Sequence, residues 1–348
     1  MTSSNLIYDG SGYQWMSETP EYSVLTDTSP TSLNQIAKIL GEAIDPLIPD
    51  AYVSSAKSLG ANPPWCFYIG KTKFLSMVDS YCKKHDDLFN KFDHGKIKSH
   101  IIISSFLNKL KPAEWCIFSV NTEELAKHNK MHIDPNLYDG YLDVPVYSRT
   151  STKTGRLKVV KGPNVLTMHS GLRKGVVNGY SIDFISMEPN LLLALQGKPP
   201  QTDIYETIKR ELFNDEISRA KVKIATMAAL YGSGREDKIA KAISEYFNCE
   251  EIVKSLEAKV IDDTIRNEYG RVIKLEGARG RHLLALWLQS TAADGAIYGF
   301  NDFYNRVSIV PHWIIHDGLI FIYKGEKVKI DSLDIGLGIK LPVKVEKL

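Results

Sequence analysis

The chain has 348 residues, of which 43% are hydrophobic and 24% charged, and its formal net charge at pH 7 is +2. This length suffices for two or three domains with sizeable cores. No run of about 18 apolar residues predicts a membrane-spanning helix, and the N-terminus lacks the basic and apolar regions of a signal peptide. The four cysteines have no metal-ligand spacing. We therefore expect no membrane partner and a reducing, cytoplasmic compartment.

Charge is unevenly distributed along the chain. Residues 1–50 carry seven acidic side chains and one basic side chain, which gives this head a charge of −6 and leaves about +8 for the remainder. A basic body is compatible with nucleic-acid binding. Hydrophobic spacing predicts helices over residues 32–47 and 71–89, whereas the β-branched run 101–110 fits either a helix or a strand.

A stretch without acidic side chains spans residues 151–174. We call it the basic strip, and its cations are Lys153, Arg156, Lys158, Lys161, Arg173 and Lys174. Turn-forming sequences at 154–157 and 162–164 indicate an irregular segment. Such a strip suits contacts with a phosphate backbone, and a solvated charged loop is the structural alternative.

An acidic residue interrupts the apolar run 180–187, which predicts a strand. Asp183 lies inside this run, where carboxylates are rare unless they are paired, hydrogen-bonded or bound to a metal. Glu188 follows five residues later, near the expected end of the strand, and a helix is expected from Leu191 to Leu195. The structural alternative places Asp183 in a turn at the end of the strand.

The segment from Arg219 to Gly232 predicts a helix that ends at its glycine. One side of it carries residues at every fourth position: Arg219, Lys223, Met227 and Tyr231. Residues four apart lie above one another on a helix, so two cations could hold a polyphosphate while the other two side chains pack on a base and sugar. The alternative is an amphipathic helix that buries Ile224, Met227 and Leu230.

The later segments combine packing elements with two further candidates. Helices are expected over 237–247, 252–269 and 281–298, and in the last of these Arg281 and Gln289 lie two turns apart on one side. Gln289 could bind a base edge or a sugar, or lie on the surface. The apolar runs around His316-Asp317-Gly318 predict a hairpin over 307–323. This hairpin is either a purely structural element or a rigid support that directs a carboxylate toward Asp183.

A final strand is expected over 341–345, where Pro342 indicates an edge strand or a strand start.

In this order, the motifs resemble the family A (DNA polymerase I-like) DNA polymerases over about residues 147–348. The resemblance covers the polymerisation module only and is closest to the phage type, which would act in the host cytoplasm. The motifs that carry it are Thr154-Gly155-Arg156-Leu157 with Pro163-Asn164, then Asp183 and Glu188, then Arg219, Lys223, Tyr231 and Gly232, then Arg281, Gln289 and Asp294, then His316-Asp317.

This resemblance implies an α+β fold with the architecture of a right hand. An antiparallel palm sheet would carry Asp183 and Asp317, with helical fingers and a reduced thumb. The implied division is an N-terminal, thumb-like region at 1–146, palm at 147–190, fingers at 191–280 and palm again at 281–348. The implied activity is template-dependent DNA synthesis that adds dNTPs to the 3′ end of a primer. No proofreading domain is expected, because residues 1–146 contain no Asp-x-Glu exonuclease motif.

The resemblance also implies roles for single residues. Asp183 and Asp317 would be the catalytic ligands of two Mg²⁺ ions, with the backbone carbonyl of Phe184 as a further ligand. Nucleotide binding is implied for Arg219, Lys223, Met227, Tyr231, Glu188 and Tyr205, and DNA binding for Thr154, Arg156, Asn164, Arg281, Gln289 and His316. The implied partners are primer-template DNA, dNTPs and a second chain that supplies exonuclease or processivity functions.

Four positions depart from the family pattern. Met227 replaces an aromatic residue, Ala285 an asparagine, Gly318 an acid and Tyr205 a histidine. None of them removes a metal ligand, but they bear on nucleotide selection and fidelity. Two other functions stay open: a single-subunit RNA polymerase, suggested by Lys223, Met227 and the sequence 231–233, and a nucleic-acid-binding subunit without catalysis.

Overall fold

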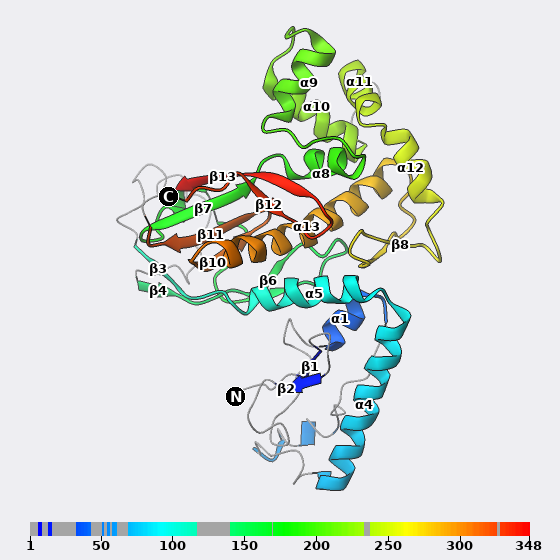
Figure 1. Cartoon of the computed structure of the whole chain (residues 1–348), viewed down its shortest axis with the longest axis vertical. Helices are drawn as coiled ribbons and strands as arrows, with labels where there is room; N and C mark the ends of the chain where they lie inside the picture. Colours follow the sequence, from blue (N-terminus) through cyan, green and yellow to red (C-terminus); the bar gives the residue numbers. More distant parts are fainter. Residues whose placement is uncertain are drawn as a thin grey trace. The chain divides into compact units, whose positions relative to one another are not determined.

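The chain divides into two compact units in a computed structural model (Figure 1). The N-terminal unit comprises residues 1–108 and 269–272, and the C-terminal unit comprises 109–268 and 273–348. The structure describes residues 6–8, 13–15, 33–42, 51, 54–55, 58–60, 69–116, 140–168, 170–232, 237–325 and 328–348. Within these residues no helix is long and apolar enough to cross a membrane. Most of the acidic head, residues 1–50, lies outside the described residues. The division into a thumb-like region, palm, fingers and palm that was expected from the sequence stays a prediction.

The described part of the N-terminal unit is mainly helical. Its elements are β1 (Leu6–Tyr8), β2 (Tyr13–Trp15), α1 (Leu33–Ile39), α4 (Lys71–Lys91) and α5 (His94–Leu107). The helix predicted over 71–89 is confirmed as α4, and the ambiguous run 101–110 is helical as far as Leu107. The helix predicted over 32–47 is too long, because α1 ends at Ile39 before Gly41. That glycine has φ 85° and no space for a Cβ against Val272.

The C-terminal unit is built on a five-stranded sheet in the order β10-β11-β7-β13-β12, and every neighbouring pair is antiparallel. The strands are β7 (Gly179–Phe184), β10 (Ile309–Ile315), β11 (Gly318–Tyr323), β12 (Ser332–Asp334) and β13 (Lys340–Lys347). Three two-stranded sheets pair β3 (Ala113–Trp115) with β4 (Gly140–Leu142), β5 (Val146–Ser148) with β6 (Lys158–Lys161), and β8 (Thr264–Arg266) with β9 (Val272–Lys274). The expected α+β class with an antiparallel sheet is therefore observed.

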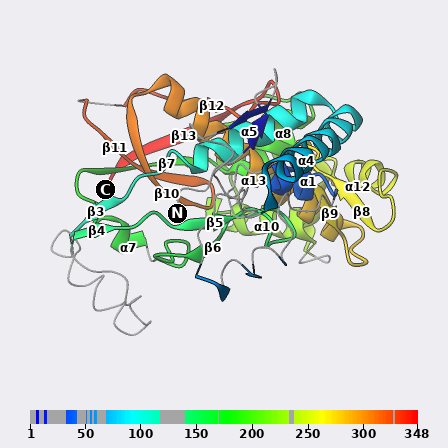
Figure 2. The same ribbon diagram turned by 90° about the horizontal axis from the view of Figure 1, so that it is seen from below.

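Seven helices are described in this unit. They are α7 (Ser170–Arg173), α8 (Met187–Leu195), α9 (Ile204–Phe213), α10 (Arg219–Tyr231), α11 (Lys238–Tyr246), α12 (Cys249–Glu257) and α13 (Arg281–Arg306). Figures 1 and 2 both show α13 lying along the five-stranded sheet, and Figure 1 shows α9, α10 and α11 gathered beyond α8. Helix α13 is longer than the predicted 281–298 because its apolar face continues to Phe303.

One face of the sheet packs on α13 through aromatic side chains. The rings of Phe184 and Phe300 are 5.7 Å apart and those of Phe303 and Phe321 are 5.0 Å apart, measured between centroids. All four rings are buried, and burial of each such side chain contributes about 1.5–3 kcal/mol. Because successive residues of a strand point to opposite faces, Phe184 on the α13 face leaves the neighbouring Asp183 on the other face.

The strand predicted over 180–187 is shorter than expected. It ends at Phe184, and Ser186 adopts a left-handed φ of 47° before α8 begins at Met187. The side-chain amide of Asn190 stabilises this turn, since it donates to the carbonyl oxygens of Ile185 at 2.7 Å and Gln201 at 2.9 Å. Glu188 therefore lies on the first turn of a helix rather than near the end of the strand.

The helix predicted over 252–269 is wrong in its second half. Helix α12 ends at Glu257 and β8 begins at Thr264. Between them, Asp262 and Asp263 adopt left-handed φ angles of 47° and 55°, which aspartate tolerates better than most residues. The Asp263 carboxylate fixes the turn because it accepts from the Gly277 amide at 3.0 Å.

The other expected elements of this unit are confirmed. Helix α10 is capped by Ser218 and ends at Gly232 with φ 78°, and α11 is capped by Asp237. The predicted hairpin forms between β10 and β11, with His316 and Asp317 as the turn. Pro342 lies near the start of β13, as expected, and it pairs there with β12.

Candidate active site

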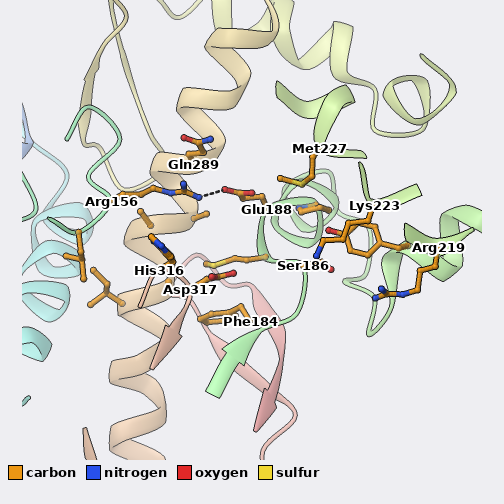
Figure 3. Close-up of a pocket in the computed structure, with 18 residues that line it drawn as sticks. Arg156, Phe184, Ser186, Glu188, Arg219, Lys223, Met227, Gln289, His316 and Asp317 are labelled. Carbon is orange, nitrogen blue, oxygen red and sulfur yellow. Dashed lines mark hydrogen bonds and ion pairs between the residues drawn. The ribbon is translucent and has the colours of Figure 1, made fainter. Parts of the chain in front are cut away.

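A pocket of about 380 Å³ opens between the end of β7, the β10–β11 turn and the helices α8, α9, α10 and α13. The predicted site residues among its walls are Arg156, Phe184, Glu188, Tyr205, Arg219, Lys223, Met227, Gln289, His316 and Asp317. Figure 3 shows His316 and Asp317 on one side and Arg219 and Lys223 on the other, with Glu188 and Ser186 between them. The Asp317 carboxylate and the cations of Arg219 and Lys223 therefore face the same space.

Two carboxylates, one on a strand and one in a turn, lie near each other at this end of the pocket. Asp183 lies on β7, opposite the first residue of β11, and Asp317 lies in the turn that precedes β11. The amide of Phe184 donates to the carbonyl oxygen of Asp317 at 3.1 Å, which fixes the turn against β7. Burial raises the pKa of Asp183, and the nearby charge of Asp317 raises it further. This electrostatic coupling means that the two carboxylates repel each other and that a cation between them would relieve the repulsion.

The residues present fit a hard cation that completes its coordination with other oxygens. Mg²⁺ is commonly held by one or two carboxylates together with substrate phosphates and water, and Asp183, Asp317 and the Phe184 carbonyl would supply oxygen ligands of this kind. No group of three or more His, Cys, Asp or Glu side chains that could hold a metal occurs in the described part of the chain. These oxygen ligands therefore fit a metal site that substrate and water complete better than a structural metal site formed by protein ligands alone.

Arg173 is a functional candidate that the sequence did not single out. It lies at the end of α7, where its pKa is lowered by burial and raised by the charges of Asp183 and Asp317. Its Nε atom is buried without a hydrogen-bond partner among the described residues. The sequence placed it only within the basic strip, because its position near the two carboxylates depends on contacts between distant segments.

Glu188 is held by groups from two other segments. Its Oε2 atom accepts a hydrogen bond from the hydroxyl of Tyr231. Its Oε1 atom accepts from Nη2 of Arg156 at 3.1 Å, and Figure 3 shows this second contact. Burial and the charge of Glu188 raise the pKa of Tyr231, and a hydrogen bond with Gln289 opposes this shift. Glu188 and Tyr231, both expected to bind the nucleotide, are therefore in contact with each other, and Arg156, which was expected to bind DNA, is paired with Glu188.

The two cations on α10 differ in their partners. Nε of Arg219 donates to both carboxylate oxygens of Asp203, at 3.1 and 2.9 Å, and the guanidinium lies 5.3 Å from the ring centroid of Tyr205. Tyr205 forms a hydrogen bond with Ser186, and its pKa is raised mainly by burial. Lys223 is exposed and has no hydrogen bond or ion pair with any residue the structure describes.

The buried face of α10 is not the one that the amphipathic alternative expected. Leu230 is buried, but Ile224 is 73% exposed and Met227 lines the pocket. The helix instead packs through Val222, Ala225, Thr226, Ala229 and Leu230. The stripe of Arg219, Lys223 and Met227 therefore faces the pocket.

Three predicted DNA-binding residues do not line the pocket. Arg281 donates to the carbonyl of Ala229 and the hydroxyl of Ser244, so it ties α13 to α10 and α11. Thr154 is buried, and Asn164 lies in the loop after β6. The DNA-binding roles of all three stay predictions.

His316 does line the pocket, with a left-handed φ of 56°. Partial burial and the charge of Arg156 lower its pKa.

Comparisons with known proteins add a distant structural likeness. No family model matches the sequence, and no curated protein matches it. Among solved structures, the chain is similar to the POL domain of Pol1 from M. smegmatis, determined in complex with DNA primer-template and dNTP. The TM-score is 0.44 and the sequence identity 14%, and the match covers 91% of this chain and 63% of that one. The chain thus spans less than two thirds of the length of that structure.

Proposed function

We propose that the protein is a template-directed DNA polymerase, a nucleotidyltransferase that adds dNTPs to the 3′ end of a primer. The observation that carries this proposal is the set of groups that line one pocket, namely the Asp317 carboxylate, the cations on α10 and Glu188, together with Asp183 beside Asp317 and the hydroxyl of Tyr231 that donates to Glu188. Phosphoryl transfer depends mainly on positioning and on stabilisation of negative charge. Carboxylates facing cations across a pocket supply both.

In this proposal Asp183, Asp317 and the carbonyl of Phe184 would hold two Mg²⁺ ions. When bound, Mg²⁺ supplies the positive charge that activates the primer 3′-hydroxyl and stabilises the leaving pyrophosphate. The coupling between the two carboxylates supports this assignment, because like charges held close together favour a bound cation.

The remaining side chains of the pocket orient the substrates. Lys223 and Arg219 bind the triphosphate, and Met227 packs against the incoming base. Glu188, fixed by Arg156 and Tyr231, occupies the space that a ribose 2′-hydroxyl would need and so favours deoxynucleotides. The hydrogen bond between Glu188 and Tyr231 favours this function over that of a single-subunit RNA polymerase.

Primer-template DNA would be held through its backbone by the basic strip. Lys158, Lys161 and Lys174 are exposed and have no ion pair with the residues that the structure covers, whereas Lys153 pairs with Glu276. A strip of unpaired lysines fits binding to phosphates without sequence preference. A second chain would supply exonuclease or processivity functions.

Primer extension by the purified chain tests this function. We expect extension with dNTPs that depends on Mg²⁺ and is abolished in Asp183→Asn and Asp317→Asn, while both variants still bind DNA. Equal extension with rNTPs would support an RNA polymerase instead. DNA binding without extension would support a non-catalytic subunit, and substantial activity in either variant would contradict the assignment of the two carboxylates.

A further inference from the structure

Asp183 belongs to a row of three residues that crosses the sheet. It pairs directly with Gly318 on β11 and with Lys344 on β13. Residues directly opposite each other in antiparallel strands project from the same face, with Cβ atoms about 4.5–5.5 Å apart. The side chain of Asp183 therefore has Lys344 as a neighbour on one side and, on the other, a position without a side chain.

The carboxylate of Asp183 lies in this gap. A Cβ atom on Gly318 would be 2.3 Å from Oδ1 of Asp183 and 3.2 Å from its Cγ, well inside the distance of about 3.5–4.0 Å at which carbon atoms pack. Lys344 does not fill the space from the other side, since its ammonium group pairs with Glu346. A side chain at position 318 and the present orientation of the carboxylate are therefore incompatible.

The backbone does not explain why position 318 is glycine. Thirteen other glycines of the described residues adopt positive φ angles, where a side chain would be strained, but Gly318 is not among them. It is the first residue of a regular strand, where any residue with a Cβ fits the backbone. The close contact is with a side chain of the candidate site, so the requirement for glycine comes from Asp183.

We propose that Gly318 is a positioning residue for Asp183. Its missing Cβ lets the carboxylate lie against the start of β11, beside the turn that carries Asp317. The link to metal binding rests on the proposed function, whereas the steric relation rests on the geometry alone. Position 318 is also where the family A pattern has an acid, so the space beside Asp183 is a departure of this chain from that pattern.

Metal binding tests the positioning role without measuring turnover. Mn²⁺ titrations followed by electron paramagnetic resonance would compare wild type with Gly318→Ala and Gly318→Glu. We expect at least about tenfold weaker Mn²⁺ binding in both variants. Gly95→Ala is the matched control, because its Cβ would lie 3.1 Å from the Asp93 carboxylate, outside the pocket. Wild-type Mn²⁺ affinity in Gly318→Ala would overturn the proposal.

A double-mutant cycle on thermal unfolding tests the steric relation separately. Gly318→Ala should lower Tm in the wild-type background, or prevent folding, and should have little effect when combined with Asp183→Ala, because the colliding carboxylate is then absent. An equal loss of stability in both backgrounds would overturn the proposal. If the wild type binds no Mn²⁺, the proposed metal site fails, and the cycle alone decides the steric relation.

Discussion

Lys223 and Arg219 lie one turn apart on α10, but their surroundings differ. Arg219 is already paired with Asp203 and stacked on Tyr205, whereas Lys223 has no partner in the described part of the protein. An ammonium group that gives up no existing ion pair can bind a phosphate at lower cost. At the scale of single residues, Lys223 is therefore the cation best prepared to bind the triphosphate.

Lys223→Ala should weaken the use of nucleotides while leaving DNA binding intact. A charge-assisted hydrogen bond contributes about 1.5–3 kcal/mol, which corresponds to a loss of roughly 10- to 150-fold in kcat/KM for dNTP. Steady-state primer extension measures this loss, and Lys221→Ala on the same helix, exposed but outside the pocket walls, is the control. Unchanged nucleotide kinetics in Lys223→Ala would contradict the assignment.

Glu188→Ala should relax discrimination between dNTPs and rNTPs. Its carboxylate is fixed by two hydrogen bonds beside the pocket, so its removal opens space for a 2′-hydroxyl and frees the hydroxyl of Tyr231. The measurement is the ratio of kcat/KM for dNTP to that for rNTP. We expect the variant to gain rNTP use even as its dNTP rate falls.

The control for this change is Glu206→Ala, which removes an exposed carboxylate from α9. A strong dNTP preference that survives Glu188→Ala would show that another residue excludes ribonucleotides.

At the scale of elements, α13 is anchored by a buried polar network. Asp294 accepts from Nη2 of Arg149 and from Nδ2 of Asn267, each at 2.9 Å, and Asn267 also donates to the hydroxyl of Ser290 at 3.0 Å. All four side chains are buried. The network joins α13, which carries Gln289, to the segment after β5 and to the end of β8.

Arg149→Met should destabilise the protein strongly. It removes a cation that donates to the buried Asp294 carboxylate, and breaking a buried ion pair in this way typically costs about 3–5 kcal/mol in the free energy of unfolding. Urea unfolding measures the difference. Arg306→Met is the comparison, because it removes a partly exposed ion pair with Asp302 on the same helix, which contributes roughly 0–1 kcal/mol. Similar losses in both variants would show that burial of the network is not decisive.

The sequence predicted elements well where their signals were local. Helix α10 was predicted with both ends, because its helix-forming residues and terminal glycine are adjacent in the chain. The prediction over 252–269 failed because apolar spacing continues across a turn built on two left-handed aspartates. The position of Glu188 was missed for a similar reason: a left-handed Ser186 ends the strand inside an apolar run.

Contacts between distant segments were mostly beyond sequence reasoning. Arg149 and Asp294 are 145 positions apart, and neither carries a pattern that points to the other. The position of Arg173 near the carboxylates likewise depends on contacts between distant segments. Glu188 and Tyr231 could be assigned to one site only because a family resemblance supplied the order of motifs. The candidate site was therefore predicted as a set of residues, but its supporting contacts were not.

At the scale of the whole molecule, a net charge of +2 conceals an acidic head and a basic body. In the basic strip, Arg156 and Lys153 are engaged with Glu188 and Glu276, but three lysines are exposed and free of ion pairs within the described residues. A nearly neutral protein can thus still bind a polyanion, because the local distribution of charge governs binding within a Debye length of about 8–10 Å.

The affinity for primer-template DNA should therefore fall steeply as the salt concentration rises. The lysines of the basic strip should determine how steep this fall is. Each neutralised phosphate contributes about −0.9 to the slope of log K against log salt concentration. The triple change K158A/K161A/K174A should make that slope shallower by roughly 2 to 3. Fluorescence anisotropy of labelled DNA at several KCl concentrations measures it. The matched control K324A/K329A/K340A removes three exposed lysines outside the strip, and equal slopes in the two variants would contradict a localised DNA-binding surface.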